Sequence, residues 1–141
     1  MRRIIYLSTS RNLMSNAEIE EILAVSRRRN QEDQVTGLLV YHEGCFFQAL
    51  EGTAQAVQSV FGRIKKDPRH ASILMLLDAE VEARAFPDWS MGFVNERDLS
   101  DVLKDASMSL QDMLDDADRF IPDPKSVTLL RSFLRSFRYN A

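Results

Sequence analysis

The sequence predicts a single α+β domain with one mixed β-sheet and helices packed on its faces. Two observations support this class. Runs rich in β-branched and aromatic residues alternate with segments whose apolar residues recur at helical spacing. Hydrophobic residues make up 45% of the 141 residues, which is enough to bury one core. The order of these segments along the chain then specifies the arrangement of the sheet.

The first strand and the first helix occupy the N-terminal part of the chain. The run Arg3–Ser8 is rich in β-branched and aromatic residues, which favour a strand. Ser15 or Asn16 can cap a helix. Apolar residues recur at helical spacing from Ile19 onward, so this helix is predicted to run to about Asn30.

A β-hairpin is predicted next, with strands at 35–42 and around Gln48 joined by the turn His42-Glu43-Gly44. Period-two alternation places Gln48 on an interior strand whose two faces are otherwise apolar. A buried primary amide needs hydrogen-bond partners, because leaving it unpaired costs roughly 1–3 kcal/mol. Something polar is therefore expected over that face of the strand.

The second helix is predicted to open at Gly52-Thr53 and to end at Asp67-Pro68. Two strands follow, at 72–81 and at 89–94. The resulting order, βαββαββ, is a ferredoxin-like arrangement with an added strand, and it gives a five-stranded mixed sheet. Right-handed crossovers then put both helices on the same face of that sheet.

The tail, residues 98–141, is predicted to form a pair of helices that caps the other face of the sheet. Pro122 and Pro124 separate two apolar stripes. The first stripe contains Leu99, Leu103, Ala106, Leu110, Met113 and Ala117, and the second contains Val127, Leu130, Leu134 and Phe137. A coiled-coil output helix is the alternative, but it needs a longer register than this tail provides.

Composition excludes several classes of function. The net charge of −3 gives no basis for general electrostatic binding of nucleic acid. The single cysteine, Cys45, fits a reducing cytoplasm, and no apolar stretch approaches the roughly 18 residues of a membrane span. Metal-ligand clusters, phosphate-binding loops and nucleophile elbows do not occur in the sequence. A cytoplasmic protein that is not an enzyme is therefore expected.

Three polar residues fall on faces that are predicted to be buried: Tyr6, Asn30 and Gln48. Taken singly, each residue can have a purely structural role, since a buried tyrosine often pairs with the backbone and a helix-terminal asparagine often acts as a cap. Together they offer donors and acceptors without net charge. That set suits a planar heteroaromatic ring held between two helices and a sheet.

Five segments carry a resemblance to a known family. They are Tyr6-Leu7-Ser8, Asn30 with Val35-Thr36-Gly37, Phe47-Gln48-Ala49-Leu50-Glu51-Gly52, Asp67-Pro68-Arg69-His70, and Phe86-Pro87-Asp88-Trp89-Ser90-Met91. Over residues 1–95 the chain closely resembles the BLUF family, which are flavin-binding sensors of blue light. The resemblance implies a photosensory domain at 1–95 and a C-terminal helical cap or output extension at 96–141.

The resemblance also implies roles for individual residues. Tyr6 is the expected donor of an electron and a proton to the excited flavin. Gln48 is the expected bridge from Tyr6 to flavin N5 and O4, whose hydrogen bonds rearrange by rotation or tautomerisation. Asn30 is expected to pair with the pyrimidine edge of the flavin. The expected relay positions are Ser8, Trp89 and Met91.

The implied cofactor is a non-covalent FAD, with FMN or riboflavin as alternatives. Four residues near the end of the second predicted helix can meet ribityl or phosphate oxygens, namely Arg63, Lys65, Arg69 and His70. A solvated helix end with cations near its negative pole is the other interpretation. Family members often carry two basic residues just before the position of Phe86, whereas this chain has only Arg84 there. With fewer expected phosphate contacts, FMN stays an alternative to FAD.

The predicted function is that of a short blue-light photoreceptor. We expect no effector domain in the 46 residues after Asn95, so output would pass through the sheet and the C-terminal helices to a separate protein partner. A homo-oligomer is also expected. The alternatives are a redox flavoprotein and a ferredoxin-like interaction module without a cofactor.

Overall fold

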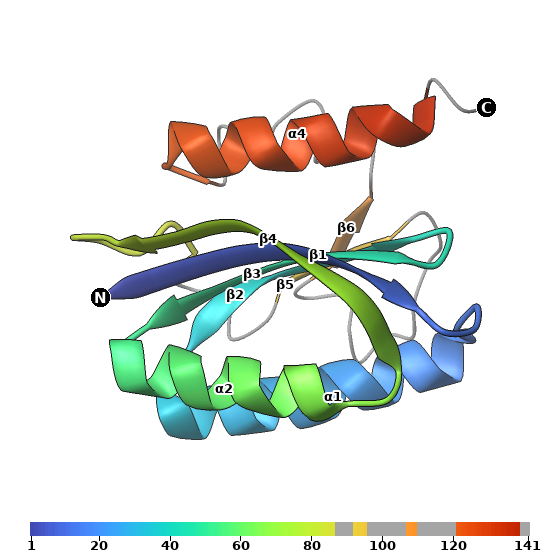
Figure 1. Ribbon diagram of the computed structural model, residues 1–141, viewed down its shortest axis with the longest axis horizontal. Coiled ribbons are helices and arrows are strands. Elements are labelled where there is room, and N and C mark those ends of the chain that lie inside the picture. Colours follow the sequence, from blue (N-terminus) through green and yellow to red (C-terminus); the bar gives the residue numbers. More distant parts are fainter. Residues whose placement is uncertain (87–91, 96–106, 110–120, 139–141) are drawn as a thin grey trace.

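The computed structural model describes residues 1–86, 92–95, 107–109 and 121–138. These residues form three layers, with a sheet between helices α1 and α2 on one face and helix α4 on the other (Figure 1). In chain order the elements are β1 (Arg2–Ser10), α1 (Asn16–Asp33), β2 (Thr36–His42), β3 (Cys45–Gly52), α2 (Ala54–Lys66), β4 (His70–Glu80), β5 (Gly92–Asn95), β6 (Ser107–Ser109) and α4 (Pro124–Arg138).

Helix α1 begins where the sequence predicts and ends later. The Ser15 side chain accepts from the Glu18 backbone N–H, and the Glu18 carboxylate accepts from the Ser15 backbone N–H, which completes a capping box. The helix continues to Asp33, because it is Gln34 that adopts the left-handed conformation of a C-cap, with φ 55°. The predicted end at Asn30 is therefore one turn too early.

The hairpin and the second helix follow the prediction. Glu43 and Gly44 both have positive φ, 49° and 80°, as a tight two-residue turn between β2 and β3 requires. The Thr53 side chain caps α2 by accepting from the Ala56 N–H, and Asp67 is its C-cap. Local sequence signals are sufficient to define these boundaries.

The strands lie in the order β4-β1-β3-β2-β5-β6. The first four pair antiparallel, whereas β5 and β6 add in parallel at the β2 edge. The predicted α+β class is confirmed, but within the described residues the sheet has six strands rather than the predicted five. The additional strand, Ser107–Ser109, lies in a segment predicted to be helical, so that prediction is wrong there. All six residues of the first C-terminal stripe, and the start of the predicted strand at 89–94, lie outside the described residues.

Strand β3 is buried on both faces. Phe46 and Leu50 belong to the core under α1 and α2, whereas Phe47 and Ala49 belong to a second core on the opposite face. Helix α4 covers that second core (Figure 1). Its buried apolar side chains are Val127, Leu130, Phe133 and Leu134. The alternation predicted for β3 is confirmed, and so is the buried position of Val127, Leu130 and Leu134 from the second C-terminal stripe. Phe133 joins them although the prediction omitted it, and the side chain of Phe137 lies outside what the structure describes.

Gly37 on β2 occupies a position where no side chain fits. A Cβ built there lies only 1.9 Å from the Ala49 carbonyl oxygen on β3. Gly37→Ala is therefore expected to push β2 away from β3 and to lower the free energy of unfolding by about 1–3 kcal/mol or more. Urea unfolding followed by circular dichroism measures this loss.

Gly62 in α2 is the matched control, because a Cβ there meets nothing within 4 Å. Gly62→Ala is expected to raise the free energy of unfolding by roughly 0.5–1 kcal/mol, through the lower backbone entropy cost of alanine in a helix. Equal losses in the two variants would contradict the close approach as the cause at Gly37.

Candidate functional site

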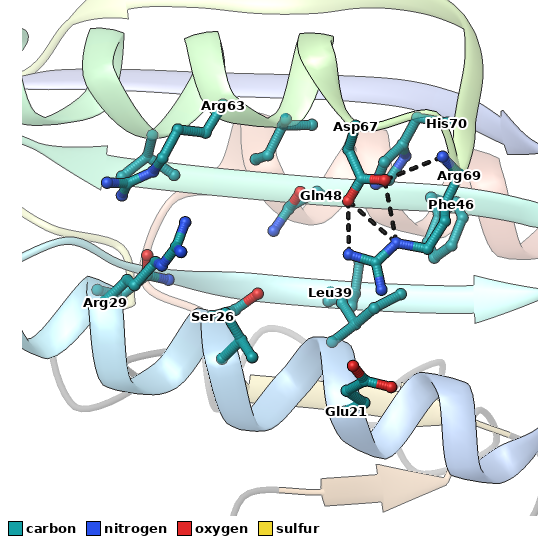
Figure 2. A pocket seen from close by; sticks show the side chains of 15 residues that line it. Glu21, Ser26, Arg29, Leu39, Phe46, Gln48, Arg63, Asp67, Arg69 and His70 are labelled. Atoms are coloured by element: carbon teal, nitrogen blue, oxygen red, sulfur yellow. Dashed lines mark hydrogen bonds and ion pairs between the residues drawn. The ribbon is translucent and has the colours of Figure 1, made fainter.

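A cavity of about 150 Å³ lies between helices α1 and α2 and the face of the sheet (Figure 2). Its lining comes from α1 (Glu21, Ile22, Val25, Ser26, Arg29 and Asn30), from the sheet (Leu39, Phe46 and Gln48), and from α2 and the residues just after it (Val60, Arg63, Ile64, Asp67, Arg69 and His70). Apolar side chains and a few polar groups thus converge in one concave site, which is typical of a small-molecule pocket.

Gln48 is held at this pocket by the pairing of β3 with β1. It is 5% exposed, and its Cα partner across the ladder is Tyr6. The Tyr6 hydroxyl donates a hydrogen bond to Oε1 of Gln48. Tyr6 does not itself line the pocket, so its hydroxyl reaches the pocket through Gln48. The polar partner expected for the Gln48 amide is therefore provided in part by Tyr6.

Burial raises the pKa of the Tyr6 phenol, and the negative charge of Asp67 raises it further. The phenol is therefore protonated and acts as a hydrogen-bond donor throughout the neutral range. Its ring packs against Phe61 of α2, with ring centroids 5.3 Å apart. These contacts fix the direction in which the hydroxyl points.

Asn30 brings a second amide to the same pocket from α1. It is only 2% exposed, although it lies in the last turn of a helix whose other side faces solvent. Ser26 precedes it by four residues and Arg29 by one, and all three line the pocket. Asn30 and Gln48 thus line the same pocket, from α1 and β3 respectively.

The predicted basic cluster is only partly gathered at the pocket. Arg63, Arg69 and His70 line it, whereas Lys65 lies 4.9 Å from the centroid of the Phe61 ring, outside the lining. Figure 2 shows Arg63 of α2 and Arg29 of α1 at the same end of the pocket. Sequence reasoning gave Arg29 no role in the site, although its spacing from Ser26 and Asn30 could have placed it there.

Acidic partners hold two of these cations. Arg63 pairs with Asp33 at 3.0 Å, which joins the ends of α2 and α1. Arg69 pairs with Asp67 at 2.6 Å at the other end of the pocket (Figure 2). The hydrogen bonds from Arg69 lower the pKa of the Asp67 carboxyl. The sequence marks Asp67 as a helix end, and its partner Arg69 lies only two residues further along the chain.

The predicted relay positions are described in part. Ser8 Oγ lies 2.9 Å from Nδ1 of His70, and the His70 ring packs on Phe46 with centroids 4.7 Å apart. Ser8 therefore contacts a residue of the pocket lining without lining the pocket itself. Trp89 and Met91 lie outside the described residues.

His70 is expected to make folding stability depend on pH. Burial lowers the pKa of its imidazole, the Asp67 charge opposes this, and the Arg69 charge adds to it. The unfolded chain therefore binds a proton more readily than the folded one. Stability should fall as pH drops below about 6.5, until the folded-state pKa is passed.

His70→Gln removes this titration and keeps a donor and an acceptor for Ser8. The difference in unfolding free energy between about pH 7.5 and about pH 5 should therefore be smaller in the variant than in the wild type. Urea titrations at the two pH values measure it. An identical pH dependence in both proteins would show that His70 carries no proton linkage.

Most of the chain matches one family model. Residues 1–92 match the model described as sensors of blue-light using FAD, or BLUF. The chain belongs to the BLUF family. The resemblance found in the sequence is thereby confirmed, and BLUF domains bind a flavin without a covalent bond.

Curated BLUF relatives share this segment within longer proteins. The blue light- and temperature-regulated antirepressor BluF of Escherichia coli is 37% identical over 105 residues, which are 72% of this chain and 26% of the relative. The photoactivated adenylate cyclase subunit beta of Euglena longa is 29% identical over 120 residues, which are 83% of this chain and 14% of the relative. This BLUF chain thus spans about a quarter or less of these relatives' length.

Solved BLUF structures share the fold over nearly the whole chain. BlrB, a BLUF protein in its dark state, has a TM-score of 0.67 at 29% identity, and the match covers 96% of each chain. Klebsiella pneumoniae BlrP1 with FMN and cyclic diGMP has a TM-score of 0.75 at 26% identity, covering 95% of this chain and 34% of that one.

The groups that line the pocket fit a flavin. Asn30 and Gln48 present amide donors and acceptors without charge, as a ring with alternating carbonyls and nitrogens requires. Leu39 and Phe46 give the pocket apolar surface that a ring could pack against, and Arg29 and Arg63 provide positive charge at one end. In the described ranges, no three His, Cys, Asp or Glu side chains group as metal ligands, and no helix combines the length and apolar character needed to span a bilayer.

Proposed function

We propose that this BLUF protein is a blue-light photoreceptor in which Tyr6 and Gln48 form the switch. The observation that carries the proposal is the hydrogen bond from the buried Tyr6 hydroxyl to the Gln48 amide, because Gln48 also lines the pocket. An amide in this position can exchange hydrogen bonds between a ligand on one side and the phenol on the other.

A bound flavin would supply the absorption of blue light and, in its excited state, would take an electron that Tyr6 supplies and afterwards recovers. Tyr6 holds the transferable proton on its hydroxyl, and its raised pKa keeps that proton in place before illumination. The lasting change is in Gln48, whose amide rotates or tautomerises so that its donor and acceptor exchange places. No net charge needs to remain in the core afterwards, which is favourable for a fully buried pair.

The cofactor we propose is FAD. Asn30 pairs with the polar edge of the ring, opposite the strand that carries Gln48. Arg29 and Arg63, which lie at the same end of the pocket, would attract the negatively charged tail. Arg84 does not line the pocket and is held by the protein, donating to the Gln34 carbonyl at 2.7 Å and to Thr36 Oγ1 at 2.8 Å. FMN stays the alternative, and extraction of the cofactor distinguishes the two.

Output passes to a separate protein, through strand five and the C-terminal helices. Ser8, Trp89 and Met91 are the relay positions of this proposal. We also propose a cytoplasmic homo-oligomer that is not itself an enzyme. Relatives named as an antirepressor and as cyclase subunits show that proteins containing this domain act on different downstream processes.

The spectrum of the purified protein tests the proposal. The protein should be yellow, and blue light should shift its absorption slightly to the red without bleaching, followed by recovery in the dark. Denaturation should release FAD. Bleaching under light would favour the redox flavoprotein, and a colourless protein that takes up neither FAD nor FMN would favour the interaction module.

A further inference from the structure

A buried carboxylate lies on the same strand as Gln48 and has no part in the switch. Glu51 is fully buried, and its Cα partner across the β1 ladder is Arg3. It follows Gln48 by three residues, so it lies roughly 10 Å along the strand and on the opposite face. A buried charge is costly unless it is paired and hydrogen-bonded, so its contacts indicate what it holds.

Glu51 holds the segment that leads from β4 toward β5. Its Oε2 accepts from the Ala85 backbone N–H at 2.9 Å, and its Oε1 accepts from the Phe86 backbone N–H at 2.5 Å. Both residues are buried. One carboxylate therefore fixes the backbone of Ala85 and Phe86 to β3.

Arg3 extends this contact to the C-terminal helix. Its Nε donates to Glu51 at 3.1 Å, and a second guanidinium nitrogen donates to the Ala83 carbonyl at 3.1 Å. The third nitrogen lies 3.3 Å from Oδ2 of Asp123, the residue just before α4. One buried guanidinium thus joins β3, the segment after β4 and the start of α4.

Asp123 is tied to α4 itself. The same Oδ2 accepts from the backbone N–H and the hydroxyl of Ser126, as an N-cap does. Burial opposes ionisation of Asp123, but the Ser126 hydrogen bonds and the charges of Arg3 and Lys125 outweigh it and lower the pKa. The carboxylate is therefore charged at neutral pH and available to Arg3.

We propose that Glu51 and Arg3 are positioning residues that transmit a shift of β3 to α4. The inference rests on the proposed switch, in which the change begins at Gln48. A displacement of β3 would move the Glu51 carboxylate, and Arg3 would carry that movement to Asp123 and to the first turn of α4. The connection consists of hydrogen bonds and ion pairs with defined partners, so single substitutions can interrupt it.

Two conservative substitutions in the full-length protein interrupt this connection. Arg3→Lys keeps the charge, but one ammonium cannot keep the three contacts of the guanidinium fork. Asp123→Asn keeps an N-cap acceptor and removes the charge that Arg3 meets. The matched control is Arg2→Lys, which alters the neighbouring residue and its exposed ion pair with Asp78.

Hydrogen exchange of residues 121–138 is measured in the dark and under blue light, and the flavin absorption shift is recorded on the same samples. The wild type and Arg2→Lys should show both the shift and a light-dependent change in exchange. Arg3→Lys and Asp123→Asn should keep the shift and lose the exchange difference. If a substitution only destabilised α4, residues 121–138 would exchange faster in the dark and in the light, and the difference between the two states would persist.

The outcomes separate this inference from the proposed function. A normal shift with an undiminished exchange difference in both variants overturns the role of Arg3 and Asp123. A normal shift in the wild type without any change in residues 121–138 overturns transmission to α4 while leaving the switch intact. Loss of the shift in the wild type overturns the switch and, with it, the inference.

Discussion

Gln48→Leu is expected to bind flavin and to lose the light-induced red shift completely. Leucine keeps the apolar bulk of the side chain at the pocket but has no donor or acceptor for the ring or for Tyr6. Leu39, Phe46 and Asn30 still line the pocket in this variant, so the dark spectrum of a flavoprotein should persist. Difference spectra before and after blue light measure the effect.

Tyr6→Phe should have the same effect, because it removes the hydroxyl that donates to Gln48 and keeps the ring that packs on Phe61. Tyr41→Phe is the matched control. Tyr41 is also buried in this core, but its hydroxyl accepts from the Met14 backbone N–H instead. A normal red shift in Gln48→Leu or Tyr6→Phe, or its loss in Tyr41→Phe, would contradict the assignment of the switch.

Truncation after Asn95 is expected to cause aggregation or a change of oligomeric state. Helix α4 covers a face of the sheet that includes Ile5, Phe47 and Ala49, and its removal would expose a continuous apolar surface. Size-exclusion chromatography with light scattering measures the outcome. A truncated protein that stays soluble and keeps the oligomeric state of the full-length protein would show that α4 is not needed as a cap.

A point substitution measures the same contact without removing the helix. Leu130 is 1% exposed and belongs to this second core, so Leu130→Ala should lower the free energy of unfolding by about 2–5 kcal/mol. Thr128, on the exposed side of the same helix, is the control, and Thr128→Ala should change it by no more than roughly 0.5 kcal/mol. Similar losses in the two variants would show that the cost arises in the helix itself rather than in its packing.

Local patterns predict the fold up to β4 because each signal acts within a few residues. Capping at Ser15, the tight turn at Glu43-Gly44 and the alternation around Gln48 are all short-range features. The strand at Ser107–Ser109 was mistaken for helix, since its parallel pairing with β5 depends on residues distant in sequence.

The candidate site is predictable to a similar degree. Tyr6, Asn30 and Gln48 could be grouped because a polar residue on a buried face requires a partner. The ion pair of Glu51 with Arg3, which are 48 residues apart in sequence, could not be found in this way. Charged residues are common at helix ends and next to turns, and only tertiary structure shows which of them are held by a partner.

Burial of β3 on both faces has a consequence for how the strand finds its place in the sheet. Because apolar residues alternate on both sides, hydrophobic pattern alone would tolerate a slip by one position. Such a slip would turn Glu51 toward the pocket under α1 and α2, and Gln48 toward α4, leaving each without its present partner at a cost of at least about 1–3 kcal/mol. The two polar side chains thus select a single alignment of β3, and a chain lacking both would be free to misalign without losing hydrophobic burial.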